Sequence, residues 1–181
     1  MFDFSENYFE LFGLPVSFRV DGAELAARYR DLQKVVHPDR FAAQGERSQR
    51  LSLQGATMVN EAFATLKDPL RRAQYILTLK GLESDGQSQT LNDPAFLMQQ
   101  LELRESLAEV PSAENPYARL DALMREIGEM IEAQVASLAV QLEDGDQGQL
   151  AAAAESVQKM QFLNKLLAEA EAVEADLEEA V

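Results

Sequence analysis

The chain has 181 residues with no cysteine, a single histidine and a formal net charge of −15 at pH 7. Without cysteine it forms no disulfide, no zinc-thiolate site and no cysteine-ligated iron–sulfur cluster, and one histidine makes a histidine-based metal site a poor prediction. We therefore expect no cofactor. The negative charge also argues against binding to nucleic acid, because phosphates call for lysine and arginine.

The charge is divided unequally along the chain. Residues 1–81 contain 11 Lys and Arg against 10 Asp and Glu, a net of +1, whereas residues 82–181 contain 5 against 21, a net of −16. Two parts of such different charge predict two surfaces that meet two different partners. No apolar run has the length of a membrane span and residues 1–6 lack a targeting pattern, so we expect a cytoplasmic protein with no membrane partner.

Two helices are predicted within the first 36 residues. Ser5 is the expected N-cap of a short helix that Gly13 ends, and Asp21 with Glu24 three residues later has the form of a capping box for the next helix. The apolar side chains of this second helix recur at spacings of four, three and four residues. They are Leu25, Tyr29, Leu32 and Val36.

A basic stripe runs along the opposite side of the second helix and ends at a triplet. Arg30, Lys34 and His37 share the stripe, and Pro38 and Asp39 follow directly. Since proline ends a helix and moves the preceding residue out of helical geometry, we expect His37 and Asp39 to project from a stiff turn. The stripe is also compatible with an ordinary solvated charged face.

Two more helices complete the first part of the chain. One is expected from about residue 48 to residue 67, and Asp68-Pro69 reads as the N-cap and first residue of the next, which Gly81 closes. The side chains of the longer helix expected to face inward are Leu51, Met58, Val59, Ala62, Phe63 and Leu66. The second and third helices should form an antiparallel hairpin.

After a segment at residues 82–92 that reads as a linker, three further helices are predicted. Asp93-Pro94 opens the first, which runs to about residue 109, and Asn115-Pro116 opens the second, which reaches about residue 143. The third continues from a turn at residues 144–148 to near the C-terminus. We see no strand alternation, so the expected fold class is all-α.

The helix that begins at residue 94 has more apolar surface than one buried stripe needs. One stripe holds Phe96, Leu103 and Leu107, and a second lies about 120° away. The second stripe and its acidic edge consist of Leu97, Leu101 and Ala108 with Met98, Glu102 and Glu105. Both stripes could be core in a three-helix bundle, or the second could be an exposed binding patch that Phe162 joins.

Nothing in the sequence predicts catalysis by the chain itself. An imidazole beside a carboxylate could form half of a general-base arrangement, but Pro38 separates His37 from Asp39 and no nucleophile motif accompanies them. The sequence contains neither GxxxxGK[ST] nor GxGxxG. An exposed, pre-bent turn beside a basic stripe suits recognition of an acidic protein surface better.

Two helices joined at a histidine–proline–aspartate triplet resemble a J-domain. The segments that carry this resemblance are Tyr29-Arg30-Asp31-Leu32, His37-Pro38-Asp39 and Asn60-Glu61-Ala62-Phe63.

Over nearly the whole chain the sequence also resembles the bacterial form of the HscB family, the J-type co-chaperones of iron–sulfur cluster assembly. The segments that carry this wider resemblance are Asp3-Phe4, Tyr8-Phe9-Glu10-Leu11-Phe12-Gly13-Leu14-Pro15, His37-Pro38-Asp39-Arg40-Phe41, Asp68-Pro69-Leu70-Arg71-Arg72-Ala73 and Ala95-Phe96-Leu97-Met98-Gln99-Gln100-Leu101-Glu102-Leu103-Arg104-Glu105. The last of them separates this family from other J-proteins.

The resemblance implies both a fold and a function. It implies an L-shaped protein with a J-domain over residues 1–81, a linker over 82–92 and a C-terminal three-helix scaffold-binding domain over 93–181. It implies a co-chaperone, not an enzyme, that binds the iron–sulfur cluster scaffold protein and delivers it to a dedicated DnaK-type ATP-dependent chaperone. By stimulating that chaperone's ATP hydrolysis it would aid maturation of iron–sulfur proteins.

The resemblance also assigns roles by position. His37, Pro38 and Asp39 would trigger ATP hydrolysis in the chaperone. The nearby basic residues assigned to chaperone docking are Arg28, Arg30, Lys34 and Arg40. The residues assigned to scaffold binding are Leu97, Met98, Leu101, Glu102, Glu105 and Phe162.

Two positions depart from the common J-domain pattern, and other functions stay open. Val36 stands where many J-domains have an aromatic residue and Arg40 replaces a frequent lysine, changes that would tune docking. The alternatives are a J-protein whose C-terminal unit binds unfolded peptides and a structural protein that oligomerises through its acidic helices. An enzyme is the most remote of them.

Overall fold

The structure is a computed structural model that describes residues 6–37, 45–82, 93–144 and 146–179. Within those ranges the regular elements are all helices, which confirms the predicted fold class. The chain divides into two compact units, Met1–Gly81 and Leu82–Val181. Apart from Leu82, the segment predicted as a linker lies outside the described residues.

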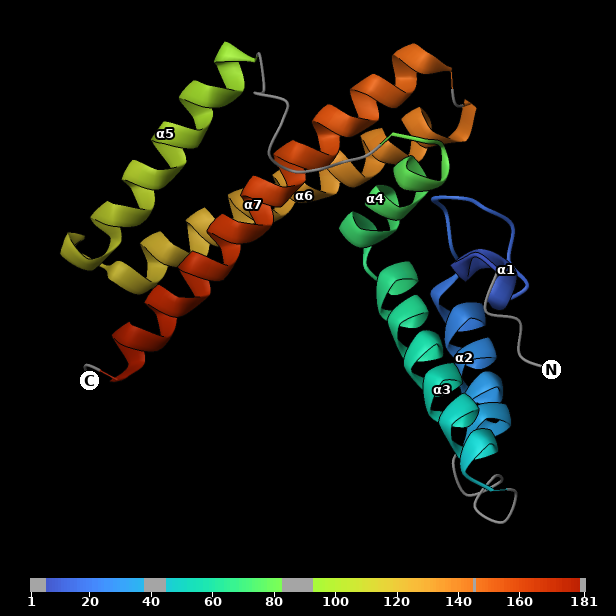
Figure 1. The fold of residues 1–181 in the computed structure, drawn as a ribbon. Helices are drawn as coiled ribbons and strands as arrows, with labels where there is room; N and C mark the ends of the chain where they lie inside the picture. The colour runs from blue at the N-terminus through green and yellow to red at the C-terminus, as the bar shows by residue number, and fades with distance from the viewer. Residues whose placement is uncertain (1–5, 38–44, 83–92, 145, 180–181) are drawn as a thin grey trace. The chain divides into compact units, whose positions relative to one another are not determined.

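The N-terminal unit is built on a helical hairpin (Figure 1). Its helices are α1 (Tyr8–Leu11), α2 (Gly22–Val36), α3 (Glu46–Lys67) and α4 (Pro69–Leu79). Helices α2 and α3 lie side by side and run in opposite directions, as predicted. Buried apolar side chains from all four helices, among them Phe9, Leu25, Leu66 and Ile76, form the core.

The helix starts follow from local capping, with two corrections to the predictions. Asn7, not Ser5, caps α1, because its side chain accepts from the N–H groups of Phe9 and Glu10 while Glu10 accepts from the N–H of Asn7. Asp21 caps α2 as predicted, accepting from the N–H groups of Ala23 and Glu24. The expected capping box is incomplete, because the Glu24 carboxylate instead accepts hydrogen bonds from the Arg28 guanidinium.

One apolar position of α3 was predicted on the wrong side. Leu51 is 41% exposed, whereas the neighbouring Ser52 is 4% exposed and faces inward. The hydroxyl of Ser52 donates a hydrogen bond of 2.6 Å to the carbonyl oxygen of Val36 at the end of α2. A buried hydrogen bond to the last turn of α2 therefore takes the place expected for an apolar contact.

The described residues of the C-terminal unit form three longer helices and one short 3-10 turn. They are α5 (Pro94–Glu109), η2 (Val110–Ser112), α6 (Pro116–Asp144) and α7 (Gln147–Glu179). Helices α6 and α7 run antiparallel along their length, and α5 packs against them (Figure 1). Side chains of all three helices and of η2 form one core: Leu103, Leu107, Val110, Leu120, Leu123, Ile127, Leu163, Leu166 and Ala170.

Candidate functional site

The end of α2 presents His37 as the sequence predicted. His37 is exposed and has extended backbone angles, φ −61° and ψ 128°, because the following proline disfavours helical geometry for it. The Ser52–Val36 hydrogen bond holds the turn that precedes it. Pro38, Asp39 and Arg40 lie outside the described residues.

The basic stripe lies beside a hollow between α2 and α3. Arg30, Lys34 and His37 line one side of it, and Ala56 and Asn60 of α3 line the other. Lys34 donates a hydrogen bond of 2.8 Å to Asp31, and this contact lowers the pKa of the Asp31 carboxyl. The structure thus brings Arg30, Lys34 and His37 together on one surface of the hairpin.

Helix α2 is positioned against α3 by an aromatic pair. The rings of Tyr29 and Phe63 stack with centroids 4.0 Å apart. The Tyr29 hydroxyl donates a hydrogen bond of 2.9 Å to the Asn60 side chain, and Gln33 donates to the same hydroxyl. These contacts join two of the segments that carry the J-domain resemblance.

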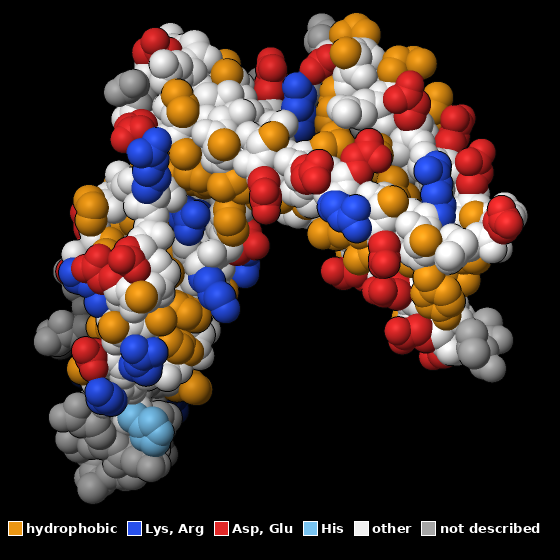
Figure 2. Space-filling view, turned by 180° about the vertical axis from the view of Figure 1, so that it is seen from behind, with side chains coloured by type: hydrophobic (Ala, Val, Ile, Leu, Met, Phe, Trp, Pro, Cys, Tyr) orange, Lys and Arg blue, Asp and Glu red, His pale blue; other side chains and the backbone are white. Residues whose placement is uncertain are grey.

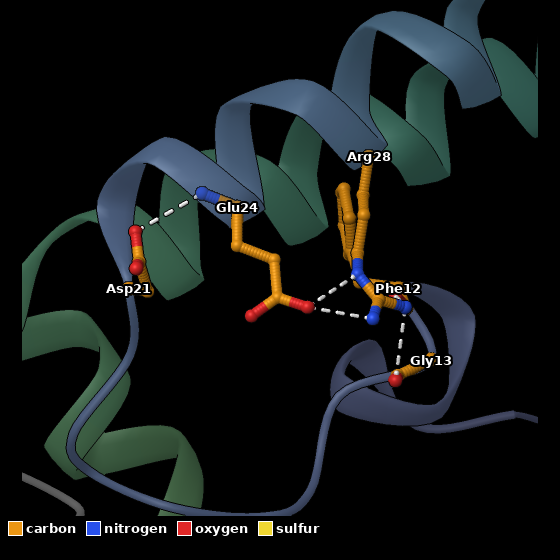
Figure 3. Close-up of polar contacts among 5 residues, drawn as sticks. All are labelled: Phe12, Gly13, Asp21, Glu24 and Arg28. Atoms are coloured by element: carbon orange, nitrogen blue, oxygen red, sulfur yellow. Dashed lines mark hydrogen bonds and ion pairs between the residues drawn. The ribbon is translucent and has the colours of Figure 1, made fainter.

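Arg28 is not part of this basic surface. Arg28 lies two residues before Arg30, and this spacing places the two side chains about 200° apart around the helix. Its Nη1 donates to the carbonyl oxygens of Phe12 at 2.7 Å and Gly13 at 3.0 Å, and its Nε and Nη2 donate to Glu24 (Figure 3). The guanidinium therefore fastens the end of α1 to α2, a role that the sequence pattern did not reveal.

In the C-terminal unit, the second apolar stripe of α5 is exposed. Leu97, Met98 and Leu101 are 49%, 59% and 51% exposed, while Phe96 and Leu103 are 5% and 3% exposed. Glu102 and Glu105 are exposed beside them. Of the two alternatives for this stripe, the structure therefore supports a surface patch and not a second core face. Apolar side chains this large rarely lie together in water without a partner.

Phe162 on α7 contacts two side chains of α5. Its ring is half-buried and meets the Phe96 ring edge-on, with centroids 5.8 Å apart. The Arg104 guanidinium lies 5.4 Å from the centroid of the same ring. Phe162 thus joins α5 to α7 through Phe96 and Arg104.

An ion pair that the sequence did not suggest fixes the start of α5. Asp93 caps the helix by accepting from the N–H of Phe96 at 3.1 Å, and its other carboxylate oxygen accepts from Lys159 of α7 at 2.7 Å. The hydrogen bond from Lys159, and then the one from Phe96, lowers the pKa of Asp93. The cap was visible in the sequence, but the two partners are 66 residues apart and no local pattern links them.

The charge of each unit is visible on its surface. Figure 2 shows Lys and Arg side chains distributed along the N-terminal hairpin, and Asp and Glu side chains more frequent on the helices of the other unit. Among the described residues no three His, Cys, Asp or Glu side chains are grouped as a metal site would need. In the same residues no helix has the length and apolar character required to cross a membrane.

Comparison with known proteins places these two units in one family. Residues 92–171 match the family model described as the HSCB C-terminal oligomerisation domain. A co-chaperone protein HscB homolog of Shewanella amazonensis is 46% identical over 168 residues, covering 93% of this chain and 97% of its own length. A homolog of the same description from Vibrio cholerae is 46% identical over 171 residues, covering 94% of this chain and 98% of its own length.

Solved structures agree with the sequence relatives. The chaperone HscB from Vibrio cholerae has a TM-score of 0.82 and 44% identity, with 95% of this chain and 99% of that one covered. The human co-chaperone protein HscB has a TM-score of 0.86 and 30% identity, with 95% and 84% covered.

A helical hairpin that presents His37, followed by a separate helical unit with an exposed apolar patch, agrees with a J-type co-chaperone, the class to which these relatives belong. The chain belongs to the HscB family, whose members serve iron–sulfur cluster assembly. Membership confirms the predicted family and the prediction that the chain is a co-chaperone and not an enzyme.

Proposed function

We propose that the chain binds the iron–sulfur cluster scaffold protein with α5 and presents it to a DnaK-type chaperone that the hairpin engages, in the cytoplasm. The observation that carries the proposal is the exposure of Leu97, Met98 and Leu101 on one face of α5, next to exposed carboxylates. Exposed apolar anchors with an acidic border are suited to a partner that is itself a folded protein with a basic rim.

The hairpin supplies the contact to the chaperone. Arg30 and Lys34 offer positive charge on the same surface as His37, which suits an acidic face of the ATPase. Pro38, Asp39 and Arg40 are assigned to the same contact by the sequence resemblance, and they lie outside the described residues. Arg28 lies on the other side of α2 and contributes to docking less directly, through the position of α1.

The test is single-turnover ATP hydrolysis by the cognate chaperone, measured with the co-chaperone alone and with scaffold added. We expect the chain to accelerate hydrolysis and the scaffold to increase that acceleration. His37→Gln should remove the acceleration under both conditions. Leu97→Ala combined with Leu101→Ala should preserve the first effect and lose the second. Acceleration by His37→Gln equal to wild type would contradict the proposed chaperone contact.

A J-protein with another client is the nearest competitor. In that case the patch on α5 would bind unfolded peptides and the folded scaffold would bind elsewhere or not at all. Isothermal titration of scaffold into the Leu97→Ala, Leu101→Ala double variant distinguishes these two functions. An unchanged affinity would show that the patch is not part of the scaffold interface.

Self-association is a second candidate, favoured by the description of the matched family model as an oligomerisation domain. Val140 on α6 is 58% exposed and could serve such a contact. Light scattering over a concentration series would support this function if assemblies grew with concentration and the chaperone gave no response.

A further inference from the structure

A groove lies next to the exposed patch of the C-terminal unit. Its volume is about 630 Å³, and side chains from α5, α6 and α7 line it. Met98 of the patch and the adjacent Glu102 form one wall, and Met130, Ala133 and Gln134 of α6 form the opposite wall. The groove and the patch are therefore one continuous surface.

The helical geometry of α5 explains how one surface can have two parts. Met98 follows Leu97 by one residue, about 100° around the helix, and Glu102 follows Leu101 in the same way. The row of Leu97 and Leu101 therefore lies next to the row of Met98 and Glu102 around α5, and it is the second row that lines the groove together with α6. A partner that covers both rows therefore also lies over the opening of the groove.

The chemistry of the groove selects the side chain that would enter it. Of its charged groups, Asp93 and Lys159 are joined in an ion pair, which leaves Glu102 to give the groove a net negative charge. Met98 and Met130 offer flexible apolar surface for an aliphatic stem. The amides of Gln99 and Gln134 add hydrogen-bond acceptors near the carboxylate. This combination suits a lysine or arginine, whose stem is apolar and whose head is cationic.

We propose that the groove between α5 and α6 receives a basic side chain of the scaffold protein, so that Met130 and Gln134 belong to the scaffold interface. The inference rests on the proposed function, because the occupant is the same partner that covers Leu97 and Leu101. It extends the interface from one helix face to two helices and makes Glu102 the group that selects the cation.

The groove can be blocked without altering α5. Ala133 is an exposed residue of the α6 wall, and a tryptophan there would fill much of the space. We expect Ala133→Trp to weaken scaffold binding at least about tenfold by isothermal titration, and Met130→Ala to weaken it less. Ala168→Trp is the matched control, because Ala168 is an exposed alanine of α7 outside the groove lining. Circular dichroism melts of all three variants confirm that the unit stays folded.

Crosslinking identifies the occupant. Since the chain has no cysteine, Gln134→Cys provides a single thiol to label with a benzophenone before the scaffold is added. Mass spectrometry should locate the crosslink in a scaffold peptide that contains lysine or arginine, while Ala168→Cys gives none. Crosslinks between two copies of this chain, or to a scaffold segment without basic residues, would overturn the inference.

The two proposals fail in different ways. If wild-type protein does not bind the scaffold at all, the proposed function is wrong. If wild type binds and the Leu97→Ala, Leu101→Ala variant does not, but Ala133→Trp binds as tightly as wild type, the patch stands and the groove inference is wrong.

Discussion

The Nη1 atom of Arg28 lies 3.0 Å from the carbonyl oxygen of Gly13 and donates a hydrogen bond to it. Gly13 has a φ of +62°, so the chain turns there in a conformation that favours glycine. A Cβ added at Gly13 would lie 2.6 Å from the same Nη1 atom. Glycine therefore suits position 13 mainly because of its positive φ, and a side chain there would also shift the end of the Arg28 side chain.

Gly13→Ala should therefore lower the free energy of unfolding by about 1–2 kcal/mol, because it strains the backbone and displaces Arg28. Urea denaturation followed by circular dichroism measures the change. Gly22→Ala is the control, because nothing lies within 4 Å of a Cβ there and alanine suits a helix better than glycine. Equal destabilisation by both substitutions would contradict the role assigned to the contact.

Arg28→Ala and Arg30→Ala should have opposite consequences. Arg28→Ala leaves the carbonyl oxygens of Phe12 and Gly13 without their donor and should cost about 1–2 kcal/mol of stability. The exposed ion pair between Arg28 and Glu24 contributes little to this loss of stability. Arg30→Ala should leave stability nearly unchanged and weaken chaperone stimulation. Urea denaturation measures the stability of both variants, and the ATPase assay measures their stimulation of the chaperone. An Arg28→Ala protein that is as stable as wild type but fails to stimulate the chaperone would instead place Arg28 in the docking surface.

Ser52→Ala should affect both stability and function. The substitution removes the buried hydrogen bond to the Val36 carbonyl, and we expect a loss of about 1–2 kcal/mol in the free energy of unfolding. Because that bond holds the residue before His37, the concentration of chain needed for half-maximal ATPase stimulation should also rise. Thr57→Ala is the matched control, since the Thr57 hydroxyl is exposed and bonds only within its own helix, to the Leu53 carbonyl.

The Asp93–Lys159 ion pair should make the stability of the C-terminal unit depend on pH. The pKa of Asp93 is lowered in the folded state, so its ionised form stabilises the fold above about pH 4, the ordinary pKa of aspartate. That contribution is lost as the pH falls through the lowered pKa. Asp93→Asn retains a capping side chain but removes the charge.

Urea denaturation of wild type and Asp93→Asn at pH values from 6 down to 3 tests this dependence. We expect the difference in unfolding free energy to be largest near pH 6 and to shrink at the acidic end. Asp121→Asn on α6 is the control substitution, because Asp121 is exposed and outside the link between α5 and α7. A constant difference for Asp93→Asn would show that the ion pair contributes nothing.

Leu97 and Leu103 on the same helix should respond to alanine in different ways. Leu103 is 3% exposed and belongs to the core, so Leu103→Ala should cost about 2–4 kcal/mol of stability. Leu97 is 49% exposed, so Leu97→Ala should change stability little and reduce scaffold affinity about tenfold or more. Thermal melts and isothermal titration distinguish the two effects. A Leu97→Ala protein that loses stability and retains affinity would contradict the assignment of the patch.

Much of the fold was accessible from the sequence because its determinants are local. Asp21, Asp68 and Asp93 each accept hydrogen bonds from N–H groups two or three residues later, so a short segment contains all the information about the helix start. Proline after His37 acts on the residue directly before it. The error at Ser5 had the same local origin, since Asn7 and Glu10 form a complete capping box two residues further on.

The contacts between helices that are far apart in the sequence, and hence the burial of each apolar side chain, were decided only by the tertiary structure. The pattern of α5 contains two apolar stripes, and whether the second is core or surface depends on how α6 and α7 pack against it. Helix α5 buries Phe96, Leu103 and Leu107 and leaves Leu97 and Leu101 exposed.

The direction in which Arg28 points and the pairing of Lys159 with Asp93 were likewise outside any local pattern. Capping and helical periodicity act over three or four residues, whereas burial and ion pairing join residues that the chain brings together from far apart. The sequence by itself therefore determined the helices and the family of this protein. Only the packing of α5 against α6 and α7 decided which of its apolar side chains remain exposed for a partner.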